Sequence, residues 1–334
     1  MHPLRYLIVG LVLALPGCDG LIDAELARRW DPADYSLLES GDLHLVLVGT
    51  GLPIPDPERL PASTAILADG EFLLVDAGPG AIRQADLLEL PVKRLSVILL
   101  THFHSDHIGG LGEALASSWF RGRENRVEVY GPPGTRRVVE GFLAAYAFDT
   151  EYRSLPRADE LEPRWMEPTV TEVAVTGEEA VQVFARGALR VSAFAVDHSL
   201  VAPAYGYRVD YRGRSVVISG DTRGYAPLAR HAKGADVQVH VAVGMPDFLR
   251  ERAIRLQERG LLPRVDPELL ASPLQAAAVA RDAGVAQLVF SHVLPINNFI
   301  LRWIFLRGVD DVYDGDVVVG RDGMRFDLEA EAGF

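Results

Sequence analysis

The stretch Thr101-His102-Phe103-His104-Ser105-Asp106-His107-Ile108-Gly109-Gly110 decides the fold and the chemistry of this chain. It follows directly on the apolar run 95–100, which predicts a buried strand. Residues i and i+2 of an extended segment point to the same side, so His102 and His104 can face one point beyond the strand's end. Imidazole and carboxylate groups are ligands of zinc and similar divalent ions. The stretch therefore predicts a metal site at the end of this strand.

Further metal-binding side chains recur in one setting along the chain. His198, Asp221 and His292 each lie in the loop directly after an apolar stretch that predicts a strand. Loops that a rigid scaffold positions at strand ends carry the functional residues of many folds. Because four ligands in one motif cannot complete two metal sites, these three residues are the candidates for the remaining ligands.

The pattern His-x-His-x-Asp-His resembles the metallo-β-lactamase superfamily, and the resemblance covers most of the chain after Leu43. The upstream segments Gly49-Thr50-Gly51 and Asp76-Ala77-Gly78-Pro79-Gly80 are closer to the RNase Z and arylsulfatase-like branch than to true lactamases. The resemblance implies an α/β fold, a four-layer αββα sandwich in which helices flank two mixed β-sheets. The order of the expected elements, strands followed by mixed strands and helices and then repeated once, favours the same architecture.

The resemblance also implies a ligand set and a mechanism. It places one ion on His102, His104 and His198, a second on Asp106, His107 and His292, and Asp221 between them. Two divalent cations are expected, Zn²⁺ first, with Mn²⁺ or Fe as alternatives. A hydroxide bridging two metals can attack a phosphorus, sulfur or carbonyl centre. Asp106 is the expected catalytic residue, because it can orient the nucleophile and take its proton.

Four other residues are expected near the metals. Asp76 and His240 are candidates to support the ligands from behind. His240 matches the histidine of a His-Glu-Ala-Thr segment in RNase Z-like proteins, but Val241 replaces the glutamate, so a core histidine stays an alternative. Arg121 and Arg123, in a segment that looks like the arylsulfatase-like relatives, can bind an anionic ester. Solvated arginines at a helix end are the alternative for both.

The expected reaction is hydrolysis of a small anionic ester, a phosphodiester or an aryl sulfate. A lactone or lactam hydrolase and a non-catalytic metal-binding lipoprotein are the alternatives. The formal charge of −13 argues against a nucleic-acid partner, because an acidic protein repels phosphates. RNase Z proteins also carry a tRNA-binding arm and a catalytic histidine. Here only a short segment separates His198 from Asp221, and Ala271 occupies the place of the histidine.

Residues 1–18 predict a bacterial lipoprotein signal peptide. Arg5 is followed by an apolar stretch over 6–15, which is too short to span a bilayer. Cys18, the only cysteine, is the expected lipidated first residue of the mature chain. Residues 19–41 are expected to form a tether and 42–330 the hydrolase domain. These features predict an exported protein, anchored by its lipid to a bacterial membrane and facing the periplasm.

Two other segments carry specific expectations. The polar residues 148–179 predict a surface excursion that could lie beside the active site. The apolar stretch 296–307, shortly after His292, predicts a helix with Phe299 and Trp303 on one face. That face could pack on the core or form an apolar lip that touches a membrane or a hydrophobic substrate.

Overall fold

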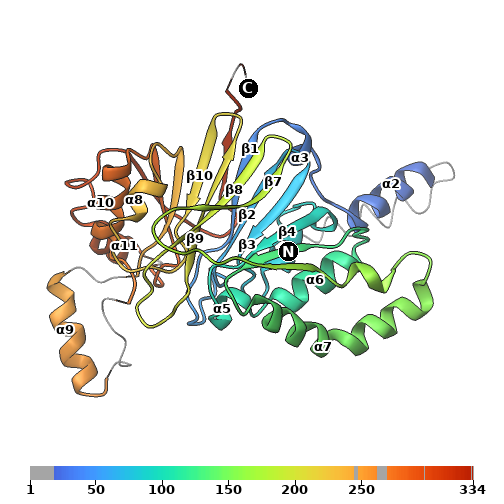
Figure 1. Cartoon of the computed structure of the whole chain (residues 1–334), viewed down its shortest axis with the longest axis horizontal. Helices are drawn as coiled ribbons and strands as arrows, with labels where there is room; N and C mark the ends of the chain where they lie inside the picture. The colour runs from blue at the N-terminus through green and yellow to red at the C-terminus, as the bar shows by residue number, and fades with distance from the viewer. Residues whose placement is uncertain (1–18, 244–246, 262–268, 297, 332, 334) are drawn as a thin grey trace.

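Two seven-stranded sheets pack face to face and carry helices on both outer sides (Figure 1). The structure is a computed structural model, and it describes residues 19–243, 247–261, 269–296, 298–331 and 333. The sequence-based prediction of an αββα sandwich is confirmed. The predicted signal peptide and Cys18 lie outside the described residues.

The first sheet has the order β14-β1-β2-β3-β4-β5-β6. Its strands are β1 (Leu43–Gly49), β2 (Ser63–Ala68), β3 (Glu71–Val75), β4 (Leu95–Leu99), β5 (Glu128–Gly131), β6 (Thr169–Glu172) and β14 (Arg325–Leu328). The pairing is antiparallel from β14 to β3 and parallel from β3 to β6. Parallel pairing sends β4, the strand before the histidine motif, toward the same sheet edge as β3 and β5.

The second sheet repeats this plan, with the order β13-β12-β11-β10-β9-β8-β7. Its strands are β7 (Val181–Arg186), β8 (Leu189–Ala195), β9 (Tyr205–Tyr211), β10 (Arg214–Ile218), β11 (Val237–Val241), β12 (Gln287–Ser291) and β13 (Asp316–Val319). Pairing is antiparallel from β7 to β10 and parallel from β10 to β13. The strands that precede Asp221 and His292, β10 and β12, therefore run in the same direction.

The helices cover the outer faces of both sheets. Those on the first sheet are α4 (Ala81–Leu87), α6 (Leu111–Phe120) and α7 (Thr135–Ser154), and those on the second are α8 (Leu228–His231), α10 (Pro273–Ala283) and α11 (Phe299–Leu306). Ser272 caps the start of helix α10, and Gln275 completes a reciprocal capping box. The remaining helices are α2 (Asp19–Trp30), α3 (Ser36–Glu39), α5 (Ser105–Ile108) and α9 (Asp247–Glu258).

Within the described residues, three apolar cores hold the layers together. The central core fills the space between the sheets with alternate residues of their strands, such as Leu45, Leu73 and Val209. The other residues of the same strands pack against the outer helices, as Leu74 does on the first sheet and Phe290 on the second. Both faces of inner strands such as β1, β3, β4 and β11 are thus buried, which explains the near-continuous apolar runs in the sequence.

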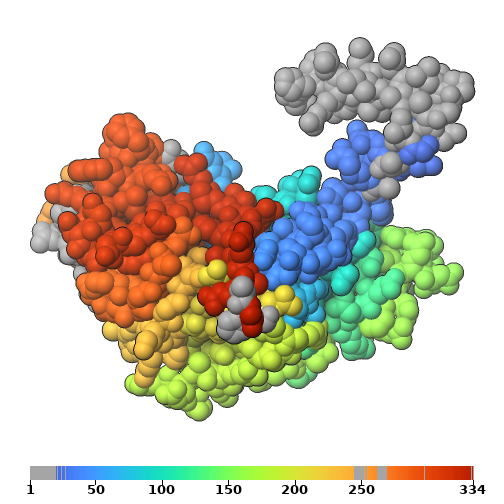
Figure 2. Space-filling view, turned by 90° about the horizontal axis from the view of Figure 1, so that it is seen from above, coloured from blue at the N-terminus to red at the C-terminus, as the bar shows by residue number. Residues whose placement is uncertain are grey.

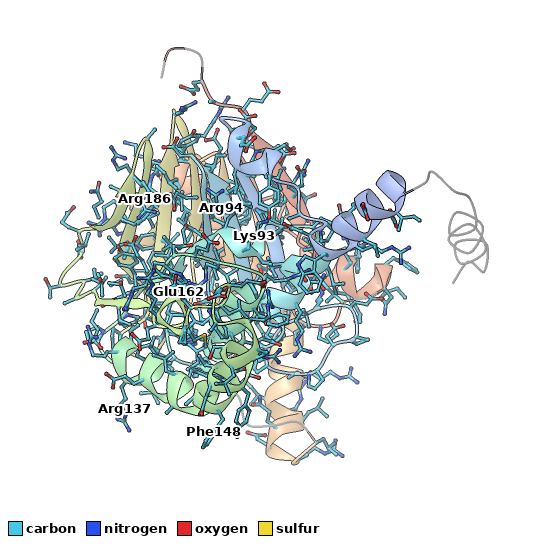
Figure 3. The ribbon with its side chains drawn as sticks, turned by 90° about the vertical axis from the view of Figure 1, so that its right-hand side faces the viewer. Lys93, Arg94, Arg137, Phe148, Glu162 and Arg186 are labelled. Carbon is cyan, nitrogen blue, oxygen red and sulfur yellow. The ribbon has the colours of Figure 1, made fainter. Side chains whose placement is uncertain are left out.

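Residues 148–179, predicted to be a surface excursion, are mostly exposed, but they contain regular elements. Helix α7 continues to Ser154, two short 3₁₀ turns follow (Leu155–Arg157 and Pro163–Trp165), and β6 then joins the edge of the first sheet. Arg137 and Phe148 project from α7 away from the sandwich (Figure 3). Ion pairs such as Arg153 to Asp149 allow a polar sequence to remain helical here.

The expected tether over 19–41 is partly structured. Helix α2 lies within it, at the opposite end of the molecule from α10 (Figure 2). Leu37 and Leu38 of α3 are buried in the outer core of the first sheet. The packed domain therefore begins a few residues before 42.

Helix α11 forms as expected, but it contacts the core through a different residue. Phe305 is buried and meets Phe290 edge to face at 5.3 Å between ring centroids. Phe299 and Trp303 are 80% and 62% exposed, so these two side chains do not pack on the sandwich. In the part of the chain that the structure describes, no helix has the length and apolar character needed to cross a bilayer.

Candidate metal centre

All seven predicted ligands converge at one edge of the sandwich, from loops of both sheets. The loop after β4 and helix α5 supply His102, His104, Asp106 and His107. The loops after β8, β10 and β12 supply His198, Asp221 and His292. The expectation that ligands follow apolar strands thus corresponds to the observed arrangement, because these strands all end at this edge.

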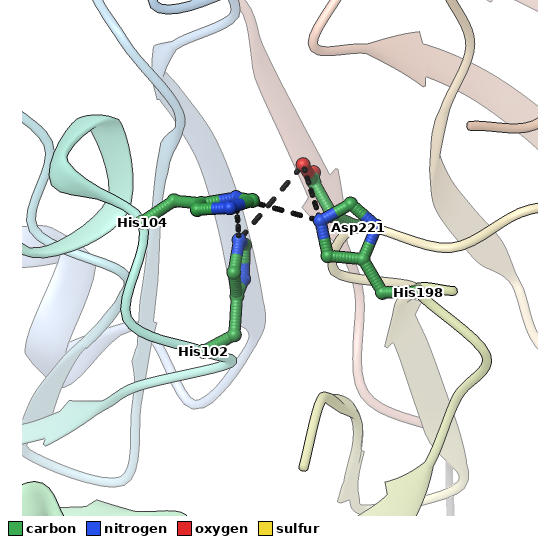
Figure 4. Close-up of side chains that lie close together, drawn as sticks. All are labelled: His102, His104, His198 and Asp221. Atoms are coloured by element: carbon green, nitrogen blue, oxygen red, sulfur yellow. Dashed lines mark hydrogen bonds and ion pairs between the residues drawn. The ribbon is translucent and has the colours of Figure 1, made fainter. Parts of the chain in front are cut away.

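The first group consists of His102, His104, His198 and Asp221 (Figure 4). Nδ1 of His104 lies 2.9 Å from Nε2 of His102 and 3.4 Å from Nε2 of His198. Oδ2 of Asp221 lies 3.8 Å from Nε2 of His198 and 4.0 Å from that of His102. Three ring nitrogens and one carboxylate oxygen therefore face one small volume.

The second group consists of Asp106, His107 and His292. Nε2 of His292 lies 3.1 Å from Oδ2 of Asp106 and 3.3 Å from Nε2 of His107. Asp221 borders this group too, because its Oδ1 is 3.5 Å from Nε2 of His107 and its Oδ2 is 3.6 Å from Nε2 of His292. Asp221 therefore lies between the two groups, as a bridging ligand would.

Both donor sets fit divalent cations. A tetrahedral zinc ion about 2.0–2.2 Å from each nitrogen or oxygen donor separates neighbouring donors by about 3.3–3.6 Å. The donor separations given above, from 2.9 to 4.0 Å, bracket that range, and all donors of a group lie within 4.8 Å of one another. Imidazole and carboxylate are also the ligand types that zinc takes. The residues present can therefore hold two ions, with Asp221 shared between them.

Asp76 supports one histidine of each group. Its Oδ2 accepts hydrogen bonds from Nδ1 of His107 at 2.7 Å and from the Thr101 hydroxyl at 2.8 Å. Because the Thr101 hydroxyl donates to Asp76, its oxygen is left to accept from Nδ1 of His102, 3.0 Å away. In both histidines the proton sits on Nδ1 and the lone pair of Nε2 faces the ligand group. The predicted supporting role of Asp76 has this geometric basis.

Thr101 and two tyrosines were missed by the sequence analysis. Besides orienting His102, Thr101 accepts a backbone hydrogen bond from Tyr205 through its carbonyl oxygen at 3.0 Å. The hydroxyl of Tyr207 donates to the Leu100 carbonyl at 2.7 Å. Strand β9 of the second sheet thus fixes the motif loop of the first. The one available signal was the position of Thr101 directly before the first histidine.

Charges in the centre favour a cation. Burial would raise the pKa of Asp221, but His292 and His107 hold it well below its ordinary value. Burial would also raise the pKa of Asp106, and the hydrogen bond with His292 and nearby charges lower it instead. Burial lowers the pKa of His102 to about 2, and it lowers that of His198 as well. Burial would lower the pKa of His107, but Asp221 and Asp76 raise it well above its ordinary value, so a cation bound there would take the place of a proton.

Solvent reaches the centre at His104. This is the exposed member of the first group, whereas His102, His198 and Asp221 are buried. Behind the ligands a small cavity lies between the sheets, and its lining includes Asp76 and the side of the second group. A substrate must therefore approach from the His104 side, where the cluster meets bulk water.

His240 does not occupy the supporting position that was one of its two expectations. Its Nδ1 donates to the Val241 carbonyl at 2.7 Å, and its β12 partner, Phe290, belongs to the outer core. Val239 and Val241, on the opposite face of β11, line the cavity behind the ligands. Burial lowers the pKa of His240 to about 4, so it is neutral at physiological pH. The alternative of a core histidine agrees with this geometry.

Arg121 and Arg123 do not reach toward the metal centre, and the substrate-binding prediction for them is corrected. Arg121 pairs with Asp86 at 2.6 Å and also donates to the Trp30 carbonyl. Arg123 is only 1% exposed and donates to backbone carbonyls of Leu115, Asn125 and Trp165. Both guanidinium groups are thus used within the outer helical layer: Arg121 pairs with a carboxylate, and Arg123 satisfies buried backbone carbonyls.

The prediction for Asp76 can be tested by replacing it with asparagine. An amide has one acceptor oxygen, so Asp76→Asn cannot accept from the Thr101 backbone amide as well as from the Thr101 hydroxyl and His107, and it loses the negative charge that holds the Nδ1 proton of His107. The orientation of both histidines is then no longer fixed. We expect the affinity of both metal ions to fall about 10- to 100-fold. Chelator competition measures this, with Asp86→Asn, on the Arg121 side, as the matched control. An unchanged affinity in Asp76→Asn would contradict the assigned role.

Comparison with known proteins agrees with this architecture. The sequence profile of the Beta-lactamase superfamily domain matches residues 72–293, from β3 to just beyond the last predicted ligand. The chain belongs to this superfamily. It is a metal-dependent hydrolase of the metallo-β-lactamase fold that acts on ester bonds. The predicted membership in the branch with RNase Z is confirmed by the relatives.

Several bacterial relatives with similar sequences carry the name Ribonuclease Z. That of Mycobacterium avium is 37% identical over 293 residues, which cover 86% of this chain and 99% of the relative. That of Mycobacterium marinum is 34% identical over 297 residues, with coverages of 86% and 99%. This superfamily member thus aligns with these relatives over nearly their whole length.

Solved structures share the superfamily fold at lower identity. The short form of human tRNase Z gives a TM-score of 0.61 at 22% identity, over 86% of this chain and 99% of that one. The metallo-β-lactamase fold protein YhfI of Bacillus subtilis gives 0.60 at 16% identity, over 86% and 99%. At these identities the likeness establishes the fold alone.

Proposed function

We propose that this protein hydrolyses phosphodiester bonds at a centre of two divalent metal ions. The observation that carries the proposal is the pair of ligand groups that share Asp221. The near full-length similarity to proteins named Ribonuclease Z supports a phosphodiester as the ester attacked. Zinc is the first expectation for both ions, because the donors are nitrogen and oxygen atoms at tetrahedral spacing.

Each residue around the centre has a separate role in the proposed reaction. Divalent cations bound here would supply positive charge for the phosphoryl oxygens and lower the pKa of water. Asp106 is ionised, and its Oδ2 lies 3.1 Å from Nε2 of His292 in the second ligand group. An ionised carboxylate at this position can accept the proton that the attacking water loses. Asp76 holds His107 in the tautomer whose lone pair faces the centre. The exposed side at His104 admits the substrate.

RNA is the first substrate to test. The composition argued against a nucleic-acid partner, but the relatives named Ribonuclease Z count against that expectation. The segment between His198 and Asp221 is short, so an RNA substrate would have to be held by other surfaces. Structured RNA is held mainly through its backbone and shape, and such contacts can be spread over several elements.

A small phosphodiester is the second candidate, and two observations favour it. Residues 135–172, which include α7, carry more acidic than basic side chains, and arginines there are paired with acids, as Arg164 is with Glu162. Ala271 is buried next to the bridging ligand, where its amide donates to the Thr222 carbonyl at 2.8 Å. A methyl group cannot protonate a leaving alkoxide, so substrates with acidic leaving groups should react best.

Substrates that differ in leaving group decide between these candidates. We expect the metal-loaded protein to hydrolyse bis(p-nitrophenyl) phosphate, and kcat/KM to fall steeply across aryl methyl phosphates as the pKa of the phenol rises. A precursor tRNA with a 3′ trailer tests the RNA reading in the same buffer. Faster turnover of the RNA than of the aryl esters would assign RNA as the substrate and contradict the small-ester candidate.

The alternative functions of the site are tested under the same conditions. An aryl sulfate and a lactone replace the phosphodiester under identical metal loading, and Asp221→Asn provides the blank for activity at the centre. Preferred turnover of either would move the function to sulfate or lactone hydrolysis. No turnover of any substrate by protein with its metals bound would favour the non-catalytic metal-binding protein.

We further propose that the protein is exported and lipid-anchored through Cys18. The supporting features are the apolar stretch over 6–15 and the position of the only cysteine after it. Palmitate labelling in a bacterial host should yield a lipidated product that Cys18→Ala abolishes, while Ser40→Ala leaves it intact. Recovery of unlabelled wild-type protein from the cytosolic fraction would contradict export.

A further inference from the structure

A second cluster of reactive side chains lies at the opposite end of the first sheet from the metal centre. The Oγ of Ser40 is 2.7 Å from Nε2 of His44, and Nδ1 of His44 is 2.6 Å from Oδ1 of Asp327. His44 and Asp327 face each other directly across β1 and β14. About 20 Å of extended backbone separates His44 from Thr50, which contacts the His292 loop. In Figure 1, α3 and α5 accordingly lie at opposite ends of the sheet.

Chemistry fixes the direction of these hydrogen bonds. A carboxylate only accepts, so Nδ1 of His44 carries a proton and donates to Asp327. In the neutral ring Nε2 then has a lone pair, and the Ser40 hydroxyl donates to it. A hydroxyl, an imidazole base and an orienting carboxylate in this order are the parts of a nucleophilic serine site, which is recognised by geometry and not by fold.

The surroundings of Ser40 leave its hydroxyl accessible to solvent and stabilise the deprotonated form of that hydroxyl. Ser40 is exposed, whereas His44 is 5% exposed and held in place. The backbone amide of Asp42 donates to Oγ of Ser40 at 3.1 Å, which stabilises negative charge on that oxygen. Gly41 turns the chain at φ +84° so that the serine meets the histidine.

A cation lies beside this turn. Nη1 of Arg212 would be 3.2 Å from a Cβ atom built on Gly41. The Arg212 guanidinium also lies over the Tyr211 ring, with its Cζ 5.1 Å from the centroid. A guanidinium next to the serine can stabilise the oxyanion that forms when an ester is attacked.

We propose that Ser40 is a nucleophile that reacts with small, exposed esters independently of the metal centre. Oγ of Ser40 bonds to the acyl carbon, and the bond from that carbon to the leaving oxygen breaks. The hydroxyl proton passes to Nε2 of His44 and then to the departing oxygen. Water later cleaves the acyl-serine, with His44 taking its proton, which returns Ser40 and releases the acid.

Labelling of the full chain with a fluorophosphonate tests this assignment after the metals are removed with a chelator. The Oγ–P bond forms, the P–F bond breaks, and the proton leaves through His44. We expect one adduct per chain, on the peptide that contains Ser40, and none in Ser40→Ala. His44→Gln should slow labelling at least tenfold, and Asp327→Asn should slow it less.

Control variants test whether labelling depends on the cluster of Ser40, His44 and Asp327. Ser36→Ala is the matched variant, because Ser36 is exposed at the start of α3, the helix that Ser40 follows, but donates to Asp34 and not to a histidine. Thermal unfolding confirms that each variant is folded, and the Asp327→Asn variant alters an exposed side chain in case His44→Gln unfolds. Equal labelling of Ser36 and Ser40, unchanged labelling in folded Asp327→Asn and His44→Gln, or no adduct at all would overturn the proposal. Because the metals are absent, none of these outcomes bears on the proposed phosphodiesterase.

Discussion

Replacing Asp221 by asparagine is expected to reduce the bound metal from about two ions to one or fewer per chain and to lower phosphodiester turnover more than a hundredfold. Loss of a side chain that only supports a ligand already lowers metal affinity or activity about 10- to 100-fold. The effect of Asp221→Asn should be larger, because Asp221 lies between both ligand groups. Asparagine keeps the shape but removes the charge that offsets the cations. Elemental analysis and initial rates on bis(p-nitrophenyl) phosphate measure the two effects.

Asp197→Asn is the matched control for this variant. Asp197 is a nearby carboxylate that pairs with Arg223 and accepts from the Ser199 amide, and it belongs to neither ligand group. We expect its metal content to stay at about two ions and its rate to change little. An Asp221→Asn protein that retains two ions and full activity would refute the shared-ligand arrangement.

A methyl group at Gly110 is expected to be among the most destabilising single changes outside the ligands. A Cβ atom there would lie 2.2 Å from the Gly78 carbonyl oxygen, so the two loops would have to separate. We expect Gly110→Ala to reduce the free energy of unfolding by about 3 kcal/mol, as overpacking against backbone does. The metal affinity should also fall, because the Gly78 loop carries Asp76. Denaturant titration and chelator competition measure these effects.

Gly141→Ala provides the opposite control. Gly141 lies inside α7, and nothing is within 4 Å of an added Cβ atom. Alanine is the better helix former, so this variant should gain about 0.5–1 kcal/mol in the free energy of unfolding. Equal destabilisation by both substitutions would show that the contact between the Gly78 and Gly110 loops is not the cause.

The positions of the ligands could be predicted because each depends on a local pattern. His102 and His104 follow a buried strand, and Asp221 and His292 do the same in the second sheet. An apolar run that stops at a histidine or aspartate carries both the strand and the loop in one short segment. The start of α10 at Ser272 was predictable for the same reason, since a cap is a local signal.

The features that could not be predicted from the sequence depend on contacts between segments that are far apart in the chain. Arg123 looked available for a substrate, but its partners include the Trp165 carbonyl, 42 residues away. Strand β6 has a polar sequence, and it is a strand because β5 offers it a free edge. His44 meets Asp327, 283 residues later, because the fold pairs β1 with β14. No periodicity or spacing in the sequence encodes such pairings.

The assembly of the centre from two sheets has a consequence for how much protein a cell keeps. The first sheet contributes four of the ligands and the second contributes three, so each bound ion ties the two halves of the chain together. An ion at a hundred times its dissociation constant adds about 2.7 kcal/mol to the stability of the folded state. Differences of about 1–2 kcal/mol already change protein abundance several-fold through proteolysis of opened molecules. Metal scarcity should therefore deplete the protein itself as well as slow its turnover.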